Sequence, residues 1–555
     1  TDIMDGVDTT WHRIAGGAKI GDAASEIIAR FDPEDPAASV PALLALRAEL
    51  THLVAESSSN ALIKEKLALL DRVLQECLGL KVQTAISHSD VVPGEPMKLH
   101  VSATMHARMP DSTHVRWLSV RFPLLNKEVK RNVDLQLNTE SSFEETEILP
   151  ATTPLTQPYW LRVEGSAGMF HVDDPELIGT AENAPSFPVE DVFEVGGQKL
   201  VVHDEPVEVT TDSKGNEIHR RLDVIPPVSL RFISDVVIMT PASKRSVVVE
   251  MKAARVGSAG TLSLEAPPGW KVEPPQQPFN LATIGQSAQF TFTIAAPDKP
   301  ETAKITASAE MNGVRYHNQR QEVSYAHLPR QLLQPAAVVK AVSFDLTKKG
   351  TTVGYLPGAG DTIPENLQQM GYAVKTLDDA NLTAKELEGL DAVVIGVRAF
   401  NVRNNIGNAM PALFSYVENG GTLIVQYNRP DKLKSEKYAP YDLHISADRV
   451  TDEKAVMTFL QPDSPILNTP NKITGSDFDG WVQERGLYFP NRWDEHFTPI
   501  LACNDPGEPA TRGVLLVARY GKGYYIYTGL GFFRQLPAGV PGAYRLFANM
   551  VSIGR

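Results

Sequence analysis

This chain has few cysteines and no long apolar runs, and each of these two features excludes certain classes of protein. The 555 residues include only Cys77 and Cys503, one on a helical pattern and one in a predicted loop, so the sequence predicts neither a disulfide scaffold nor a cysteine metal site. Because no stretch approaches about 18 uninterrupted apolar residues, we expect no transmembrane segment. The opening sequence TDIMDGVDTTWHRI lacks both a basic start and an apolar core, so we expect no signal peptide in this chain.

Basic residues are also fewer than acidic ones. The chain has 53 Lys and Arg against 67 Asp and Glu, a formal net charge of -14 and a pI near 5.5. Nucleic-acid binding needs clustered Lys and Arg that neutralise phosphates, so we expect no nucleic-acid partner. The hydrophobic fraction of 42% is that of a folded globular protein, and the length predicts about three to four domains.

The spacing of apolar residues changes along the chain and predicts a multidomain α+β protein. Residues 1–80 carry apolar residues at helical spacing and are predicted to form N-terminal helices. Residues 81–225 alternate apolar and polar side chains, as in MKLHVSATMHA, which predicts an antiparallel β-sandwich. Residues 226–328 contain four more strand patterns, including AQFTFTIAAP, and predict a second sandwich. After a linker at 329–337, strands and helices alternate through 338–555, which predicts a doubly wound parallel α/β domain.

One strand, loop, helix and strand unit at 385–428 organises this last domain. The apolar run at 392–395 predicts a buried strand, and the apolar residues at 410–417 recur at the spacing of a crossover helix. The β-branched run at 422–425 predicts the next parallel strand. The polar loop at 398–408 then lies at the carboxyl edge of the sheet, where ligands bind in open α/β sheets.

Polar side chains that follow the predicted strands make this edge a candidate ligand-binding site. The rim residues are Arg398, Asn401, Arg403, Gln426, Asn428 and Arg534. The long loop SDFDGWVQERGLYFP supplies further candidates, which are Asp479, Trp481, Glu484 and Arg485. We predict one pocket without a nucleophile that favours a polyhydroxylated or anionic ligand, because arginine suits planar bidentate contacts. Two alternatives stay open. In the first, Arg398, Asn401 and Arg403 form an internal salt-bridge network with Asp477, Asp479 or Glu484. In the second, Trp481 packs with Tyr488 as a lid of the core.

The C-terminal part resembles a known family. With GVRAF, ENGGTLIVQYN and GKGYYIYTGLGF, residues 335–555 resemble a class I glutamine amidotransferase-like domain of the trehalose-utilisation branch, which is flavodoxin-like in fold. Such enzymes need a cysteine thiolate at the strand-to-helix elbow and a histidine base. Here the elbow has Arg398, and Phe532 stands where that branch has the histidine of its LGH motif. The resemblance therefore implies a degenerate domain without glutaminase activity.

The whole order of parts resembles the non-catalytic region that follows the catalytic domain in large bacterial PIG-L (LmbE-like) deacetylases. The resemblance rests on GVDTTWHRI, FDPEDPAASVPALL, GYLPGAGDTIPENLQQMGYAV and SDFDGWVQERGLYFP. Residues 226–328, with PPGWKVEP and GQSAQFTFTIAAP, resemble immunoglobulin-like domains attached to glycoside-active enzymes. The resemblance implies a zinc-dependent N-deacetylase domain upstream of Thr1, a periplasmic or extracellular location, and a carbohydrate-binding or scaffolding role for this chain.

We expect no cofactor or metal within these residues. The carboxylate cluster HVDDPE at 171–176 is interpreted as the cap of a turn, because a zinc site needs a paired histidine and a defined ligand geometry. A second function remains open, in which the chain is a stand-alone α/β hydrolase that acts on a sugar. Its acid and base would be carboxylates between Asp477 and Glu484.

Overall fold

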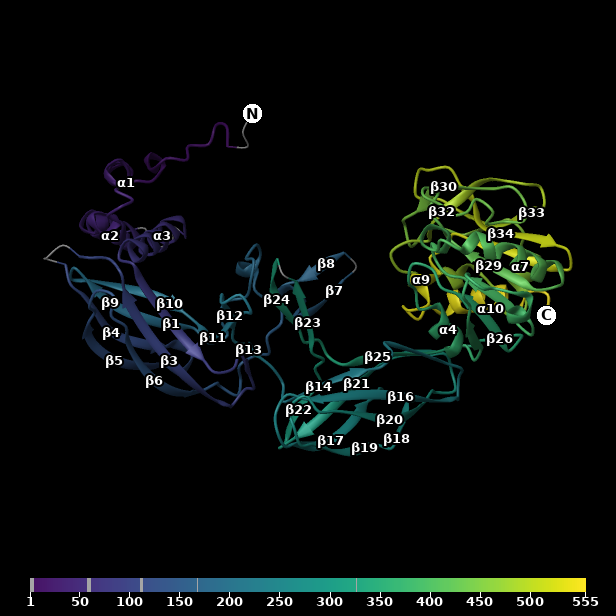
Figure 1. Ribbon diagram of the computed structural model, residues 1–555, viewed down its shortest axis with the longest axis horizontal. Coiled ribbons are helices and arrows are strands. Elements are labelled where there is room, and N and C mark those ends of the chain that lie inside the picture. Colours follow the sequence, from purple (N-terminus) through teal and green to yellow (C-terminus); the bar gives the residue numbers. More distant parts are fainter. Residues whose placement is uncertain (1–3, 57–60, 110–112, 167, 326) are drawn as a thin grey trace. The chain divides into compact units, whose positions relative to one another are not determined.

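The computed structural model describes most of the chain (Figure 1). The described residues are 4–56, 61–109, 113–166, 168–325 and 327–555. Strands hold about 40% of the residues and helices about 21%. The protein is therefore multidomain and rich in β-structure.

Contacts divide the chain into two compact units. The first unit is Thr1–Pro227 with Asn318–Pro335, and the second is Val228–His317 with Ala336–Arg555. This grouping differs from the predicted ranges, because the segment after His317 returns to the first unit instead of continuing the second sandwich.

Two sheets form the sandwich of the first unit. One has the strand order β12-β11-β1-β3-β6 and the other β10-β9-β4-β5. The strands are β1 Leu80–Ile86, β3 Pro96–Met105, β4 Val115–Phe122, β5 Lys127–Asp134, β6 Ser141–Ile148, β9 Val189–Val195, β10 Gln198–Asp204, β11 Pro206–Thr211 and β12 Glu217–Arg221. The alternation in the sequence places every second residue inside, so Leu99 and Val101 of β3 share a core with Trp117 of β4.

Three helices complete the core of the first unit. They are α1 Ala18–Arg30, α2 Val40–Glu56 and α3 Ala61–Cys77. Asn60, which the sequence predicts as the cap of α3, lies outside the described residues. Leu43 and Leu50 of α2 and Leu74 of α3 are buried in the same core as the sandwich. The helices thus cover one part of the sandwich and do not form a separate bundle.

By length and composition alone, the stretch Pro36–Ala55 around α2 is apolar enough to cross a membrane. Core helices of soluble proteins pass the same test. The leucines of α2 that enter the core of the first unit give its apolar character a structural reason. The absence of a transmembrane segment stays a prediction.

The returning segment contributes a hairpin, β23 Gln321–Tyr325 and β24 Leu328–Leu333, to the first unit. Part of β24 lies where the sequence predicts a linker, and that prediction was wrong. Beyond the hairpin, the Gln334 side-chain amide donates to the carbonyl oxygens of Thr156 and Val224, at 2.8 and 2.9 Å. These bonds attach the segment to the first unit.

The second unit begins with another sandwich. Its sheets have the orders β14-β16-β20-β18 and β15-β25-β21-β17-β19, with β22 paired to β21. The strands are β14 Val228–Phe232, β15 Val236–Met239, β16 Lys244–Ala253, β17 Ser258–Glu265, β18 Lys271–Glu273, β19 Gln276–Leu281, β20 Ser287–Ala295, β21 Glu301–Met311, β22 Val314–Tyr316 and β25 Val338–Ser343. β25 pairs with β15 and β21, so the segment predicted to open the α/β domain completes this sandwich.

An eight-stranded sheet of order β27-β26-β28-β29-β35-β34-β33-β31 forms the rest of the second unit. The five strands from β27 to β35 are parallel, and the last three are antiparallel. The strands are β26 Thr352–Leu356, β27 Ala373–Thr376, β28 Ala392–Ile395, β29 Thr422–Gln426, β31 Thr458–Phe459, β33 Phe497–Cys503, β34 Thr511–Tyr520 and β35 Gly523–Thr528. A separate hairpin pairs β30 Leu443–Val450 with β32 Gly486–Trp493.

Both faces of the parallel strands are buried. The helices are α4 Ile363–Gln369, α5 Ala384–Leu387, α6 Ala399–Val402, α7 Ile406–Glu418, α8 Pro465–Asn468, α9 Phe532–Gln535 and α10 Pro541–Ser552. Val394 of β28 lies in one core with Phe547 of α10, whereas its neighbour Ile395 lies in another core with Leu413 of α7. Two-sided burial explains why β28 and β29 read as continuous apolar runs instead of alternating ones.

Candidate functional site

The turn after β28 is the centre of the candidate site. β28 ends at Ile395, and Arg398 precedes α6 with a left-handed backbone, φ 57° and ψ 22°. This conformation is unfavourable for a residue with a β-carbon. It is held in place because the Arg398 amide donates to the Tyr427 carbonyl oxygen at 2.8 Å, and the Phe400 amide donates to the Asn428 side chain at 2.9 Å. The turn after β28 is thus fixed to the turn after β29.

The loop after β26 closes against the same turn. One Asp361 carboxylate oxygen accepts from the Tyr355 hydroxyl at 2.6 Å, and the other accepts from the Val397 amide at 3.1 Å. Burial and the Asp361 carboxylate raise the pKa of Tyr355, so its hydroxyl stays protonated and donates. Three successive strand ends therefore meet through named hydrogen bonds.

The Arg398 side chain is half-buried at this edge. Its Nε is buried without a hydrogen-bond partner, and the guanidinium forms no ion pair with any residue that the structure describes. Glu484, one predicted partner, instead accepts from Arg534 Nε at 2.7 Å. The internal network predicted as an alternative does not form as predicted, because Glu484 pairs with Arg534, Asp477 with Arg545, and Arg403 with Asp379.

Three aromatic side chains lie near Arg398 and Arg534. Tyr427 and Tyr488 have ring centroids 5.9 Å apart and nearly parallel rings, and Tyr427 lies 5.2 Å from Phe533. The Arg534 guanidinium lies 4.8 Å from the Phe533 ring centre. Burial raises the pKa of Tyr427, and the charges of Arg398 and Arg534 oppose that rise. Tyr427 is thus close enough to both arginines to feel their charge.

The other predicted rim residues hold the loops in place. The Asn401 side chain accepts from the Arg429 amide at 2.9 Å, and the Arg403 guanidinium pairs with Asp379. Gln426 and Asn428 are almost fully buried, and Asn428 also donates its amide to the Tyr527 hydroxyl at 3.2 Å.

Of the candidate site residues in the loop around Trp481, some are buried and one is exposed. Trp481 is only 3% exposed, its Nε1 donates to the Asp477 carbonyl oxygen, and its ring lies 6.0 Å from that of Phe532. Arg485 is 4% exposed and donates to the Ala455 carbonyl oxygen at 2.9 Å. The predicted aromatic wall at Trp481 is therefore part of the core, as the packing alternative states. Asp479 is exposed.

The sequence prediction did not name Tyr427 or Phe533 as site residues, and it named Tyr488 only as part of a lid of the core. Tyr427 directly follows β29, Tyr488 lies within β32, and Phe533 follows the GLGF turn. Only the position of Tyr427, next to two predicted rim residues, was a usable signal. Aromatic residues beside strand ends usually belong to the core, so their type alone did not single them out.

Neither cysteine is placed for nucleophilic chemistry. Cys503 is buried at the end of β33, and burial raises the pKa of its thiol to about 12. Burial also raises the pKa of Cys77. A thiolate is the reactive form, so burial and a raised pKa both disfavour nucleophilic chemistry at these two thiols.

Two carboxylates of the alternative hydrolase prediction are held by their neighbours, and the third, Asp479, is exposed. Asp477 is buried, pairs with Arg545 at 3.0 Å and accepts from the Thr474 amide at 2.7 Å. Glu484 pairs with Arg534. No observation favours an acid and base pair at these residues.

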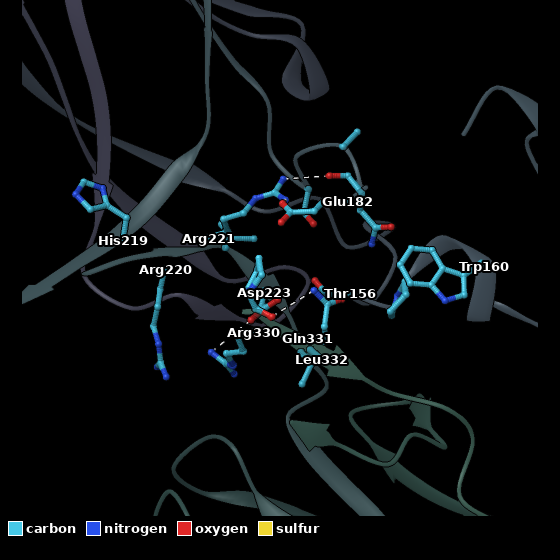
Figure 2. Close-up of a pocket in the computed structure, with 16 residues that line it drawn as sticks. Thr156, Trp160, Glu182, His219, Arg220, Arg221, Asp223, Arg330, Gln331 and Leu332 are labelled. Carbon is cyan, nitrogen blue, oxygen red and sulfur yellow. Dashed lines mark hydrogen bonds and ion pairs between the residues drawn. The ribbon is translucent and has the colours of Figure 1, made fainter. Parts of the chain in front are cut away.

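A cavity of about 230 Å³ lies in the first unit (Figure 2). Figure 2 shows Arg221 joined to Glu182, at 2.8 Å, and Arg330 beside Asp223, at 3.4 Å. Burial raises the pKa of Asp223, and the charge of Arg330 opposes the rise. The cavity is smaller than a usual ligand pocket, and these charges are satisfied by one another. We interpret the cavity as a gap within a network of ion pairs, and this network attaches the hairpin of β23 and β24 to the rest of the first unit.

Within the described ranges, no group of three or more His, Cys, Asp or Glu side chains could hold a metal ion. In the cluster at 171–176, the Asp174 carboxylate accepts from the Glu176 amide at 3.0 Å and caps a short helical turn. The expectation that this chain holds no metal stays a prediction.

Comparisons with known proteins give only weak likenesses. No protein-family model and no curated protein match the chain. A putative GMP synthase protein from Thermoplasma acidophilum is 10% identical over 38% of this chain and 96% of its own, with a TM-score of 0.26. Exo-β-1,4-mannosidase Op5Man5 from Opitutaceae bacterium strain TAV5 is 14% identical over 36% of this chain and 35% of its own, with a TM-score of 0.22. Red sea bream transglutaminase is 9% identical over 51% of this chain and 34% of its own, with a TM-score of 0.23. Likenesses this low carry no argument about function.

Proposed function

We propose that this chain is the non-catalytic, ligand-binding and scaffolding part of a PIG-L (LmbE-like) deacetylase that acts outside the cytoplasm. In this proposal a zinc-dependent N-deacetylase domain precedes Thr1 and is the partner that the chain braces. The eight-stranded sheet belongs to a doubly wound, amidotransferase-like domain that has lost its nucleophile. Its carboxyl edge binds an anionic saccharide.

The observation that carries the binding proposal is the unpaired guanidinium of Arg398. A half-buried arginine without a carboxylate partner loses part of its hydration. A bound anion would replace the lost hydrogen bonds to water with hydrogen bonds to its own oxygens. Arginine presents parallel N–H groups that match the two oxygens of a carboxylate. An acidic sugar, such as a uronic acid, supplies that carboxylate.

The residues around Arg398 support a sugar as the rest of the ligand. Tyr488 and Phe533 are half-buried and offer aromatic edges and faces, and both rings lie beside the buried ring of Tyr427. Aromatic side chains combine an apolar surface with polar tips, which suits the alternating CH and OH groups of a pyranose. Glu484 neutralises Arg534, so Arg398 supplies the surplus positive charge.

The same turn supports a binding role over a catalytic one. In the amidotransferase-like family the elbow residue is the nucleophile, and here that position is Arg398, which cannot act as one. The backbone at Arg398 has the left-handed conformation of a strained turn, whereas the side chain at this position is a cation and not a nucleophile.

Isothermal titration calorimetry of the full chain with trigalacturonate, compared with neutral maltotriose, tests the proposal. We expect trigalacturonate to bind, added salt to weaken its binding, and Arg398→Ala to weaken it by roughly tenfold or more, the cost of one buried charged contact. Arg429→Ala is the matched control, since Arg429 pairs with Asp431 on the surface, and it should bind as the parent does. Equal loss in both variants, or no preference for the acidic sugar, would contradict the binding site.

The family part of the proposal has a separate test. Reading the coding sequence before the codon for Thr1 should reveal a domain with a PDDE-type carboxylate cluster and a paired histidine. A different domain there, or a natural start at this residue, would refute the deacetylase assignment without affecting the calorimetric result.

A further inference from the structure

A second cavity in the second unit has the size of a ligand site. Its volume is about 540 Å³, within the range of small-molecule pockets. It lies beside the β30 and β32 hairpin and the start of β34. The lining residues that matter here are Asp448, Arg449, Asn491, Trp493, Glu508 and Arg512.

The hairpin is irregular where it lines this cavity. The register between β30 and β32 shifts on both sides of Asp448, and Asp448 and Arg449 lie opposite Phe489 and Leu487. The Ser446 hydroxyl fixes the irregular stretch, because it donates to the Phe489 carbonyl oxygen at 2.7 Å and accepts from the Asp448 amide at 3.0 Å. Such bulges redirect side chains and are common beside functional sites. The irregularity therefore positions two adjacent charged residues at the cavity.

Four charged side chains line the cavity without forming ion pairs. Asp448 and Glu508 carry negative charge, and Arg449 and Arg512 carry positive charge, so their formal charges cancel. None of the four has an ion-pair partner or a side-chain hydrogen bond within the part of the chain that the structure describes. Elsewhere in this unit, Arg403 and Arg534 are paired with carboxylates. All four side chains are exposed to solvent and present donors and acceptors of both kinds at the cavity, and the charge of Arg449 also lowers the pKa of the neighbouring Asp505.

An indole completes the lining. Trp493 ends β32, is half-buried, and packs at the margin of a core that includes Leu443. Because its inner part packs on the core, the ring is held in place and its remaining surface is available at the cavity. The Asn491 side chain is oriented by a contact of 2.9 Å with His444 Nδ1.

We propose that this cavity is a binding site for a neutral oligosaccharide. One pyranose ring packs its CH face against Trp493, and its hydroxyl groups bond with Asp448, Glu508, Arg449 and Arg512. Each hydroxyl can donate to a carboxylate and accept from a guanidinium, so a neutral polyol satisfies both kinds of group. Because the four formal charges cancel, the lining gives neither an anion nor a cation a net electrostatic advantage over a neutral ligand. This site does not include Arg398 and stands whether or not the carboxyl edge binds an anion.

Binding of neutral hexaoses to the full chain tests this site. We would titrate maltohexaose, cellohexaose and mannohexaose by calorimetry and by saturation-transfer NMR. We expect at least one to bind, Trp493→Ala to weaken that binding by roughly tenfold or more, and Asp448→Asn to weaken it by a smaller factor. Trp493→Phe, which keeps the packing and an aromatic face, should retain most of the affinity, and an unchanged circular-dichroism spectrum of Trp493→Ala would show that its loss of binding is not unfolding.

Two control variants separate this site from other surfaces. Trp160→Ala removes an indole from the first unit, and Arg398→Ala alters the carboxyl edge, so neither should change binding of the neutral hexaose. The proposal is overturned if none of the three sugars binds, or if Trp493→Ala binds as tightly as the parent. It is also overturned if Trp160→Ala loses as much affinity as Trp493→Ala. Trigalacturonate binding that persists in Trp493→Ala would leave the proposal for the carboxyl edge intact.

Discussion

Gly358 and Val397 touch backbone to backbone: a β-carbon on Gly358 would stand 2.1 Å from the Val397 carbonyl oxygen. Gly358 lies in the loop after β26, and Val397 lies in the turn that positions Arg398. No side chain fits between the two strand ends. The close approach, together with the Asp361 hydrogen bonds, fixes the geometry of the carboxyl edge.

Gly358→Ala should therefore destabilise the second unit. The added methyl group cannot be accommodated without moving one of the two loops, and overpacking of this kind typically costs about 1–3 kcal/mol. Differential scanning calorimetry would show a lower Tm for the transition of this unit. Gly475→Ala is the matched control, because no atom lies within 4 Å of the position that its added methyl group would occupy and its φ is ordinary, so its Tm should hardly change.

Arg398→Gly should separate stability from binding. Glycine adopts the left-handed conformation without strain, whereas an L-residue pays roughly 1–2 kcal/mol there, and this gain is partly offset by the entropy of glycine in the unfolded chain. We expect a free energy of unfolding equal to that of the parent or up to about 1 kcal/mol higher, measured by urea denaturation. Trigalacturonate binding should be lost in the same variant. A clear loss of stability would mean that the Arg398 side chain contributes to the core.

The sequence located the strand and helix unit at the centre of the second unit because its burial is extreme. Residues 392–395 and 422–425 are apolar throughout, and the structure has the parallel strands β28 and β29 there, with α7 between them. Full burial on two faces leaves few alternatives for such runs.

The sequence did not determine which sheet each strand joins. β25 has the pattern of any buried strand, and its pairing with β15 and β21 depends on contacts more than thirty residues away in the chain. The prediction of a linker at the segment that contains β24 was wrong for a similar reason. PRQLLQPAA has two prolines and reads as a linker, whereas its pairing with β23 gives it a strand.

At the candidate site, the sequence identified polar residue types but not their partners. Arg398 and Arg403 are indistinguishable in the sequence, yet Arg403 is paired with Asp379 and Arg398 is unpaired. Trp481 lies in a polar loop and nevertheless enters the core, because the loop folds back on α9 and places the indole against Phe532. Pairing and burial of this kind are set by tertiary structure.

Arg403→Met should destabilise the second unit more than a comparable surface change. The Asp379 side chain is only 5% exposed, so removal of its arginine leaves a buried carboxylate without its cation, which typically costs about 3–5 kcal/mol. Arg429→Met removes an arginine from a pair whose side chains are 43% and 49% exposed, and such pairs contribute about 0–1 kcal/mol. Urea denaturation of the two variants would measure the difference. Equal effects would mean that Asp379 finds another partner or becomes protonated at little cost.

Asp191 is fully buried on β9 in the sandwich of the first unit. Burial raises its pKa well above the ordinary value of 3.8, and the nearby Asp204 carboxyl on β10 raises it further. Burial also raises the pKa of Asp204. A group with a higher pKa in the folded state binds its proton more tightly there than in the unfolded chain. Its contribution to stability is complete below about pH 3.8 and is lost as the pH rises through the raised pKa.

Asp191→Asn removes this titration while it keeps the shape of the side chain. The parent should therefore lose stability relative to Asp191→Asn as the pH rises from about 5 through the raised pKa, and urea denaturation at several pH values would measure that slope. Asp134→Asn is the control, since Asp134 is exposed and its pKa is lowered by a hydrogen bond from Arg116. Because Asp134 is already ionised throughout this range in both states, the difference between that variant and the parent should not depend on pH. A flat difference for Asp191→Asn would mean that Asp191 is ionised in the folded protein, with a cation or water that compensates its charge.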